Sequence, residues 1–326
     1  MSNEGLDIDV RELPGVGEVT ARKLKEAGIY TVRELLLYSP IYLSELLNIS
    51  EERAEKLVIT AHDFLRERGL ISDDFISAEE LLEKIKRRRY ITTGSRNLDN
   101  LLKGGIATQA VTEFYGEFGS GKTQLCHTLA VNVQLPESEG GLNQNAIYID
   151  TEKTFSPSRI VEIATAKGLN PSDILKNIIV ARAYNTTHLL LLIKMLPEKI
   201  KSNNVGLVAI DSAVAPFRAE YLGRGKLAER QQLLNRLMHD LIRIAELYDA
   251  AIVITNQVQA QPDIMFGDPT KPVGGHVVAH AVTYRIYLRK AKQKGLRIAS
   301  IVDSPEHPPG ETLFLISEEG ITDPTT

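Results

Sequence analysis

The residues best suited to chemistry lie in one stretch, Gly116–Thr123, with the sequence GEFGSGKT. This spacing is typical of a phosphate-binding loop, in which glycine backbone N–H groups surround phosphate oxygens. Lys122 would reach the β- and γ-phosphates, and the hydroxyl of Thr123 would help to hold Mg²⁺. The residues expected to contact nucleotide are Gly116, Glu117, Phe118, Gly119, Ser120, Gly121, Lys122, Thr123 and Gln124. The stretch therefore predicts a binding site for a nucleoside triphosphate.

The segments on either side of this stretch have the patterns that such a site requires. Ala110–Tyr115 (AVTEFY) is rich in β-branched and aromatic residues, which predicts a strand. Leu125, Leu129 and Val133 recur at helical spacing, so we expect a helix to begin near Lys122. The N-terminus of a helix favours anions. This context argues against the alternative interpretation, an ordinary glycine-rich turn.

Further apolar runs predict buried strands, each followed by a polar side chain: Asn145–Ile149 by Glu152, Val205–Ile210 by Asp211 and Ala250–Thr255 by Gln257. In an open α/β sheet, ligands bind at the C-terminal ends of the strands, so these side chains are expected beside the phosphate-binding loop. Asp211 would hold Mg²⁺, Glu152 would activate the attacking water, and Gln257 would sense the γ-phosphate.

The composition is that of an ordinary globular protein. Of the 326 residues, 43% are hydrophobic and 25% are charged, and the length suggests about two domains. With a formal net charge of -4, nucleic acid would have to be bound by local basic patches. The single cysteine, Cys126, excludes an internal disulfide. We find no signal peptide and no apolar run of about 18 residues, so we expect a soluble, cytoplasmic protein without a membrane partner.

The chain divides into three parts by pattern. Residues 1–70 predict a small helical domain, in which Thr31 and Ser50 begin helices. Residues 71–93 predict a linker with a short helix capped by Ser77. Residues 94–326 alternate between strand and helix patterns, which indicates an α/β fold with a mostly parallel central sheet.

Two features of the first 93 residues each allow two interpretations. Leu13–Gly17 (LPGVG) resembles the turn of a helix-hairpin-helix, whose amides contact DNA phosphate, but it also fits a plain tight turn in a helical bundle. The basic residues of 84–89 fit either a solvated helix C-terminus or a DNA contact. Phe75 is an isolated aromatic residue in a polar connector, which by itself indicates little.

Two long polar segments follow the expected catalytic strands. Arg218–Arg230 (RAEYLGRGKLAER) is rich in basic residues and glycine, and Gln259–Gly275 is rich in proline and ends in two glycines. Long loops in compact domains are usually functional or disordered. Their position suits DNA-binding loops that respond to the nucleotide, since single strands are bound through basic side chains and mobile backbone.

Taken together, several segments resemble one family. GEFGSGKTQLCH, YIDTE, LVAIDS, FRAEYLGRGKLAERQQ, ITNQV, DPTKPVGGH and IVDSP occur in the order seen in archaeal RadA recombinases, which are RecA-like ATPases. The resemblance covers nearly the whole chain, including a helix-hairpin-helix domain and the linker. It implies a filament on single-stranded DNA that uses ATP and Mg²⁺, pairs with double-stranded DNA and exchanges strands. It also implies DNA-dependent ATP hydrolysis, self-association and possible mediator partners.

The resemblance also implies roles for individual residues. Glu152 matches the residue that activates water and Gln257 the γ-phosphate sensor. Arg159 matches the arginine that stacks on adenine, while Asp303 and Pro308 match a cap that a neighbouring subunit lays over the nucleotide. The matched DNA contacts are Arg218, Arg224 and Arg230 in the first loop and Lys271, Gly274 and Gly275 in the second. The matched assembly residues are Phe75 and Ala78 of the polymerisation motif, Ala181 and Ala183 of its pocket, and His280, which links the interface to the second loop.

The chain departs from the family pattern next to the expected catalytic residue. Lys153 stands where the family usually has glycine, and Ser156 replaces a common arginine. Lys153 either points away from the nucleotide or pairs with Glu152 and slows hydrolysis. Two other functions therefore stay open, a ring-forming RecA-like motor and a non-catalytic recombination mediator.

Overall fold

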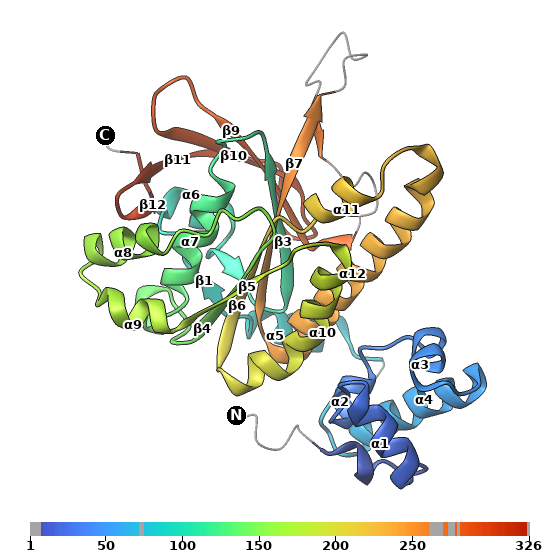
Figure 1. Cartoon of the computed structure of the whole chain (residues 1–326). Coiled ribbons are helices and arrows are strands. Elements are labelled where there is room, and N and C mark those ends of the chain that lie inside the picture. The colour runs from blue at the N-terminus through green and yellow to red at the C-terminus, as the bar shows by residue number, and fades with distance from the viewer. Residues whose placement is uncertain (1–7, 72–74, 261–269, 273–277, 279–280, 325–326) are drawn as a thin grey trace. The chain divides into compact units, whose positions relative to one another are not determined.

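The computed structural model describes residues 8–71, 75–260, 270–272, 278 and 281–324. By its internal contacts the chain forms two compact units, Met1–Arg87 and Arg88–Thr326. Figure 1 shows the elements of both units, and each unit is described by itself.

The first unit is helical. Its elements are η2 Val10–Glu12, α1 Glu18–Glu26, α2 Val32–Leu35, α3 Pro40–Leu47, α4 Glu51–Glu67 and α5 Ala78–Lys86. The predicted helix starts are confirmed, because Thr31 and Ser77 form capping boxes and Ser50 accepts from a backbone N–H of α4. Apolar side chains such as Leu24, Ile29 and Leu43 form its core. Local capping and apolar spacing therefore account for this unit.

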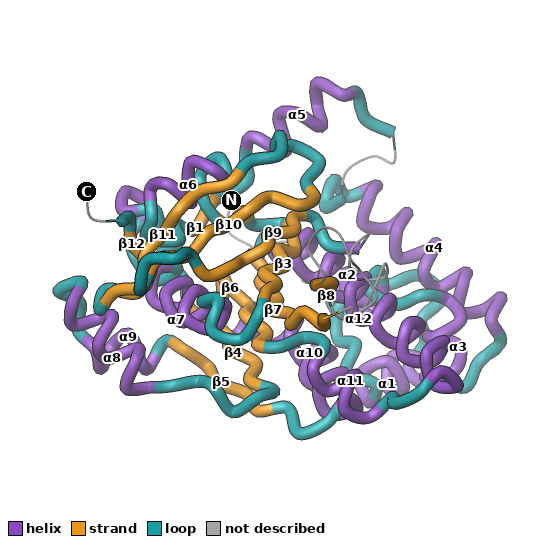
Figure 2. Tube along the Cα trace, turned by 90° about the horizontal axis from the view of Figure 1, so that it is seen from above, coloured by secondary structure: helices purple, strands orange, loops and turns teal. Residues whose placement is uncertain are grey.

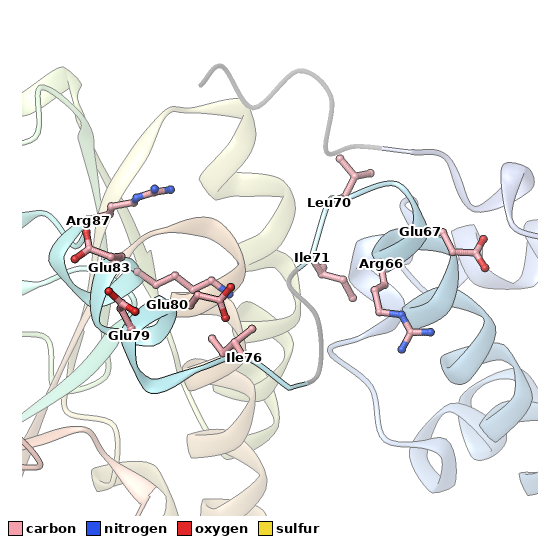
Figure 3. Close-up of a pocket in the computed structure, with 11 residues that line it drawn as sticks. Arg66, Glu67, Leu70, Ile71, Ile76, Glu79, Glu80, Glu83 and Arg87 are labelled. Carbon is pink, nitrogen blue, oxygen red and sulfur yellow. The ribbon is translucent and has the colours of Figure 1, made fainter.

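A wide cavity of about 970 Å³ also lies in the first unit (Figure 3). Its walls come from segments on both sides of residues 72–74, and many of its lining side chains are charged, among them Arg66, Glu67, Glu79 and Glu83. The lining residues of α5 are all exposed or only partly buried. We therefore do not regard this cavity as a ligand site.

The second unit contains the central sheet. Its strands are β1 Tyr90–Ile91, β2 Ile106–Ala107, β3 Ala110–Gly116, β4 Asn145–Asp150, β5 Ile178–Arg182, β6 Val205–Asp211, β7 Ala251–Ala260, β8 Thr270–Pro272, β9 Tyr284–Lys290, β10 Leu296–Asp303, β11 Glu311–Ser317 and β12 Gly320–Thr322. The large sheet has the order β12-β11-β10-β9-β3-β7-β6-β4-β5. The part of the sheet that runs β9-β3-β7-β6-β4-β5 is parallel, as predicted. The part that runs β9-β10-β11-β12 is antiparallel.

Helices cover both faces of this sheet (Figures 1 and 2). They are α6 Arg96–Leu101, α7 Lys122–Asn132, η3 Glu137–Glu139, α8 Pro157–Ala166, α9 Pro171–Lys176, α10 Thr186–Ser202, α11 Ala215–Glu220, η4 Arg224–Lys226 and α12 Leu227–Tyr248. On one face Leu125 of α7 and Ile160 of α8 join a core that includes Phe114 and Tyr148 of the sheet. Helices α10 and α12 contact each other and strands of the sheet on the opposite face. None of the described helices is long and apolar enough to cross a membrane.

Several boundaries differ from the sequence-based expectation. The linker was expected to run from residue 71 to residue 93, but residues 88–93 belong to the second unit. That unit begins at Arg88, and Tyr90–Ile91 pairs with Ile106–Ala107. Ile91 is fully buried, so its side chain belongs to the core of the second unit. Strand β7 runs on to Ala260 and therefore includes Gln257, which was expected after the end of the strand.

The described parts of the two expected DNA loops contain regular structure. Arg218 lies in α11 and Arg230 in α12, so only residues 221–226 connect these helices, with η4 inside the connection. At the start of the second segment, Val258–Ala260 pairs antiparallel with Thr270–Pro272 of β8. Polar composition alone did not distinguish these elements from a loop.

Candidate nucleotide-binding site

The Gly116–Thr123 loop joins β3 to α7, as predicted. Gly119 and Gly121 have φ values of 77° and 107°, in the left-handed region that favours glycine. A Cβ atom at Gly116 would lie 2.1 Å from the backbone oxygen of Leu288 on neighbouring β9. Glycine at these positions therefore allows the loop conformation and the close approach of the two strands.

Lys122 is folded back into this loop. Its Nζ donates to the carbonyl oxygens of Gly116 and Glu117, at 2.8 and 2.9 Å, and only 9% of the residue is exposed. Burial lowers its pKa, while the carboxylates of Asp211 and Glu152 oppose that change. The ammonium group is thus held inside the loop by carbonyl oxygen atoms. Phosphate oxygens are also hydrogen-bond acceptors, so the same group could donate to them.

Asp211, at the end of β6, lies beside the loop and is almost completely buried. Its Oδ2 accepts hydrogen bonds from the hydroxyl groups of Thr123 at 2.7 Å, Tyr148 at 2.9 Å and Thr154 at 3.2 Å. The hydroxyl of Thr255 donates to the other oxygen, Oδ1. The carboxylate is therefore fixed in direct contact with Thr123.

This arrangement fits a magnesium ion that is bound together with a nucleotide. Mg²⁺ in such sites keeps several waters and takes one or two protein oxygens plus phosphate oxygens. The contact between Thr123 and Asp211 offers a hydroxyl and a carboxylate at one point. Among the described residues no group of three or more His, Cys, Asp and Glu side chains forms a dedicated metal cage, and this type of site does not need one.

Glu152 and Gln257 meet at the same edge of the sheet. The Nε2 of Gln257 donates to Oε1 of Glu152 at 2.9 Å. Burial, and next the carboxylate of Asp211, raise the pKa of Glu152 above its ordinary value. Because β7, β6 and β4 follow β3 in the sheet order, the three predicted side chains lie beside the loop as expected.

These residues surround a cavity of about 740 Å³, within the usual range for small-molecule sites. Arg159 of α8 lines it, and its Nε donates to Oε1 of Gln124 at 2.8 Å. Its guanidinium also donates to the carbonyl oxygens of Ser317 and Glu318. Arg159 is thus fixed as one wall of the cavity, next to the loop.

Sequence reasoning missed the part of the wall that comes from the antiparallel strands. Lys294, Gly295, Arg297 and Ile316 line the same cavity. Nε of Arg297 donates to the carbonyl oxygen of Gly119 at 3.0 Å. These residues follow the loop by more than 170 positions, and nothing in their local pattern indicated a nucleotide contact.

The predicted assembly residues of the second unit that the structure describes are not among the residues that line this cavity. Asp303 ends β10 and Pro308 lies in the following turn, and neither belongs to the lining described for this cavity. Phe75 is 96% exposed. Ala181 lies in β5 at the edge of the sheet, and Ala183 follows it.

The predicted DNA contacts are only partly described. The exposed Arg218 lines a second cavity, of about 420 Å³, together with Ser212, Asn256 and Gln257. Arg230 lies near the start of α12 and is partly buried. The side chains of Arg224 and Lys271, and all of Gly274, Gly275 and His280, lie outside the described residues.

Comparison with known proteins relates this geometry to a family. A family model named Rad51 matches residues 85–324, which is most of the chain. The chain belongs to the Rad51 family. A second model, the SAM-like helix-hairpin-helix tandem, matches residues 7–63. The chain is also 49% identical over 317 residues to the protein named DNA repair and recombination protein RadA of Cenarchaeum symbiosum (strain A), covering 97% of this chain and 79% of that protein.

The helix-hairpin-helix match decides between the two interpretations of Leu13–Gly17. In this Rad51-family chain the turn lies between η2 and α1, with Gly15 at φ 84° and Gly17 as the N-cap of α1. A Cβ atom at either glycine would meet no other atom within 4 Å, so the backbone here is open to its surroundings. The segment is a helix-hairpin-helix and not merely a tight turn in a bundle.

The solvated helix end is the wrong interpretation for the last two basic residues of 84–89, because α5 ends at Lys86. Arg88 donates to Glu306 at 2.9 Å and to the hydroxyl of Tyr284 at 3.2 Å. Arg89 donates to Asp249 through two nitrogens, at 3.1 and 2.8 Å. These arginines attach the start of the Rad51-family domain to the rest of its unit.

Lys153 stands in a backbone conformation that glycine adopts more readily. Lys153 has φ 61°, a left-handed conformation that is costly for a residue with a side chain. Its side chain is exposed, and in the described part of the chain no ion pair joins it to Glu152. Glu152 is instead hydrogen-bonded to Gln257. Of the two expectations for Lys153, the geometry favours the one in which it points away from the site.

Proposed function

We propose that this protein is an ATP-dependent DNA recombinase, which assembles on single-stranded DNA, pairs it with a homologous duplex and exchanges strands. Membership of the Rad51 family supports the general function, and the relative named for DNA repair and recombination agrees with it. The observation that carries the catalytic part is the contact between Glu152 and Gln257 beside the phosphate-binding loop. A non-catalytic mediator would have no use for this pair.

In the proposed reaction the loop binds the phosphates of ATP, with Lys122 donating to the β- and γ-phosphates and Arg159 stacking on adenine. Thr123 and Asp211 would hold Mg²⁺, which when bound neutralises charge on the phosphate oxygens. Glu152 accepts a proton from the attacking water, and its raised pKa makes it a better base. Its hydrogen bond to Gln257 fixes the orientation of the carboxylate.

The proposed response to nucleotide passes through β7. Gln257 contacts Glu152, and the same strand continues to Ala260. There it pairs with β8, which lies in Gln259–Gly275, the second segment expected to bind DNA. A change at the γ-phosphate would therefore shift a strand that leads directly into that segment. The proposed DNA contacts are Arg218, Arg224 and Arg230, between the start of α11 and the start of α12, and Lys271 of β8 with Gly274 and Gly275.

The proposed assembly places ATP between copies of the chain. Asp303 and Pro308 would cover the nucleotide of a neighbouring copy, and His280 would link that interface to the second DNA segment. The ring of Phe75, which is exposed in the single copy, would enter the surface at Ala181 and Ala183 of another copy, with Ala78 close by. Burying apolar surface of this kind favours association.

Electron microscopy of the protein with single-stranded DNA and a non-hydrolysable ATP analogue tests the proposal. We expect open helical filaments that require both the DNA and the nucleotide. Closed rings would favour the RecA-like motor instead. Failure to form any ordered assembly, together with absent single-turnover ATP hydrolysis, would favour the mediator.

Glu152→Gln should lower kcat for DNA-dependent ATP hydrolysis by about 100-fold or more, since a general base contributes roughly 10²–10⁴-fold. ATP affinity should change little, because the phosphates are held by the loop and Lys122. A malachite-green phosphate assay and fluorescent-nucleotide titration measure the two effects. Glu139→Gln, an exposed change in η3, is the control. Hydrolysis at the normal rate in Glu152→Gln would remove this residue from the reaction.

Arg218→Ala should weaken binding of single-stranded DNA without changing ATP affinity. A phosphate contact acts on all sequences alike, so the slope of log affinity against log salt should fall by roughly 0.7 for each phosphate that is no longer neutralised. Fluorescence anisotropy over a salt series measures it, with Arg289→Ala, an exposed change in β9, as the control. An unaltered slope would show that Arg218 does not touch the DNA backbone.

A further inference from the structure

The turn between β10 and β11, residues 304–310, has a fixed internal conformation. The side-chain oxygen of Ser304 accepts hydrogen bonds from the backbone N–H groups of Glu306 and His307, at 3.2 and 3.0 Å. The Nδ1 of His307 lies 2.7 Å from the same oxygen. The side chain of Ser304 thus holds the first half of the turn in one shape.

The same turn is attached to distant parts of its own unit through Glu306. The carboxylate of Glu306 accepts from Nη1 of Arg88 at 2.9 Å, and its backbone oxygen accepts from Nζ of Lys103 at 2.5 Å. Nη1 of Arg88 also donates to the hydroxyl of Tyr284, whose ring packs edge-on against His307 with centroids 5.3 Å apart. Arg88 and Tyr284 therefore hold both Glu306 and His307.

The pair of Arg88 and Glu306 is better shielded from solvent than the pair of Arg289 in β9 and Glu311 in β11. The side chains of Arg88 and Glu306 are 17% and 29% exposed, whereas those of Arg289 and Glu311 are 41% and 61% exposed. Exposed pairs contribute little and are screened by salt, but partly buried charges keep more of their interaction. The position of Glu306 is thus held more firmly than a surface ion pair would hold it.

The ion pair joins two segments that face neighbouring copies in the proposed assembly. Asp303 directly precedes Ser304, and Pro308 directly follows His307, so the two expected cap residues flank the fixed part of the turn. Arg88 is the first residue of the second unit and follows the segment that carries Phe75. The contact between Arg88 and Glu306 therefore connects the end of the segment that carries Phe75 with the turn that carries the expected cap residues, Asp303 and Pro308.

We propose that Arg88 and Glu306 are positioning residues, which set the place of Asp303 and Pro308 over the nucleotide of a neighbouring copy and couple this cap to the segment bearing Phe75. The inference rests on the proposed function, because it requires ATP to lie between copies. It goes further in assigning a role to two residues that do not line the candidate nucleotide cavity.

The test is Glu306→Gln, which removes the charge and keeps the shape of the side chain. In the presence of single-stranded DNA, we expect the apparent KM for ATP to rise about fivefold, which corresponds to about 1 kcal/mol, with kcat at saturating ATP within about twofold. Arg88→Met should give the same rise, and the double variant should add nothing to it. Glu311→Gln, which breaks the exposed pair, is the matched control and should leave KM unchanged.

A second measurement separates positioning from a purely structural role. In a Phe75→Glu background, where copies do not assemble, Glu306→Gln should have no effect on the affinity for a fluorescent ATP analogue. If the affinity fell about fivefold in that background as well, the pair would act on the nucleotide site of its own copy. If KM were unchanged in the assembling protein, the pair would act on the nucleotide site of neither copy. Both results overturn the inference. If instead ATP hydrolysis by the unmodified protein does not depend on its concentration or on Phe75, the proposed function fails and not this inference alone.

Discussion

Lys122→Ala is expected to abolish ATP-dependent strand exchange and to lower kcat/KM for ATP hydrolysis by at least about 100-fold, as loss of a preorganised charge stabiliser does elsewhere. Among the described residues, Nζ of Lys122 is hydrogen-bonded to oxygen atoms of the loop, and the carboxylate of Asp211 acts on its charge. An alanine there leaves the phosphates without their buried cation. Exchange of labelled DNA strands and steady-state hydrolysis measure the loss.

The control for this variant is Lys176→Ala. Lys176 lies in α9 with its side chain 73% exposed, and it forms a surface ion pair with Asp173. Its removal should change neither strand exchange nor hydrolysis, since exposed pairs contribute about 0–1 kcal/mol. Undiminished strand exchange in Lys122→Ala would refute the assignment of the phosphate-binding loop.

The second large effect is expected from Phe75→Glu, which should convert the assembling protein into single copies. A fully exposed aromatic side chain gains roughly 1.5–3 kcal/mol when it is buried, and a carboxylate in the same apolar site costs more than this gain. The penalty applies at every interface along a filament, so long assemblies should disappear altogether. Multi-angle light scattering with a non-hydrolysable ATP analogue present measures the mass.

Ile59→Glu provides the matched control for the assembly experiment. Ile59 lies in α4 and is 54% exposed, so this change also puts a carboxylate in place of an exposed apolar side chain of the first unit. Assembly should survive it, because Ile59 is not part of the proposed contact. If Phe75→Glu had the same mass distribution as the unmodified protein, docking of the ring onto another copy would be ruled out.

What the sequence by itself determined about this protein is local in the chain. The loop Gly116–Thr123 between a strand and a helix, the buried strands before Asp211 and Glu152, and the capping boxes at Thr31 and Ser77 were all predicted and are all present. Each depends on residues a few positions apart, whose spacing records the period of a helix or strand or the geometry of a turn. The placing of three polar side chains at one edge followed from a general rule for parallel sheets, and needed no knowledge of this chain in particular.

Only the tertiary structure decided which distant side chains complete the site. The contacts of the Tyr148 and Thr255 hydroxyls with Asp211, and of Arg297 with the Gly116–Thr123 loop, were not anticipated. Neither was the ion pair of Glu306 and Arg88, which lies outside the site. The physical reason is that such contacts depend on the order and direction of strands far apart in the chain. The periodicity of the sequence does not indicate which distant residue a hydroxyl or a guanidinium group will contact. The sequence thus indicated the chemistry, and the order and direction of the strands, parallel and antiparallel alike, decided what surrounds it.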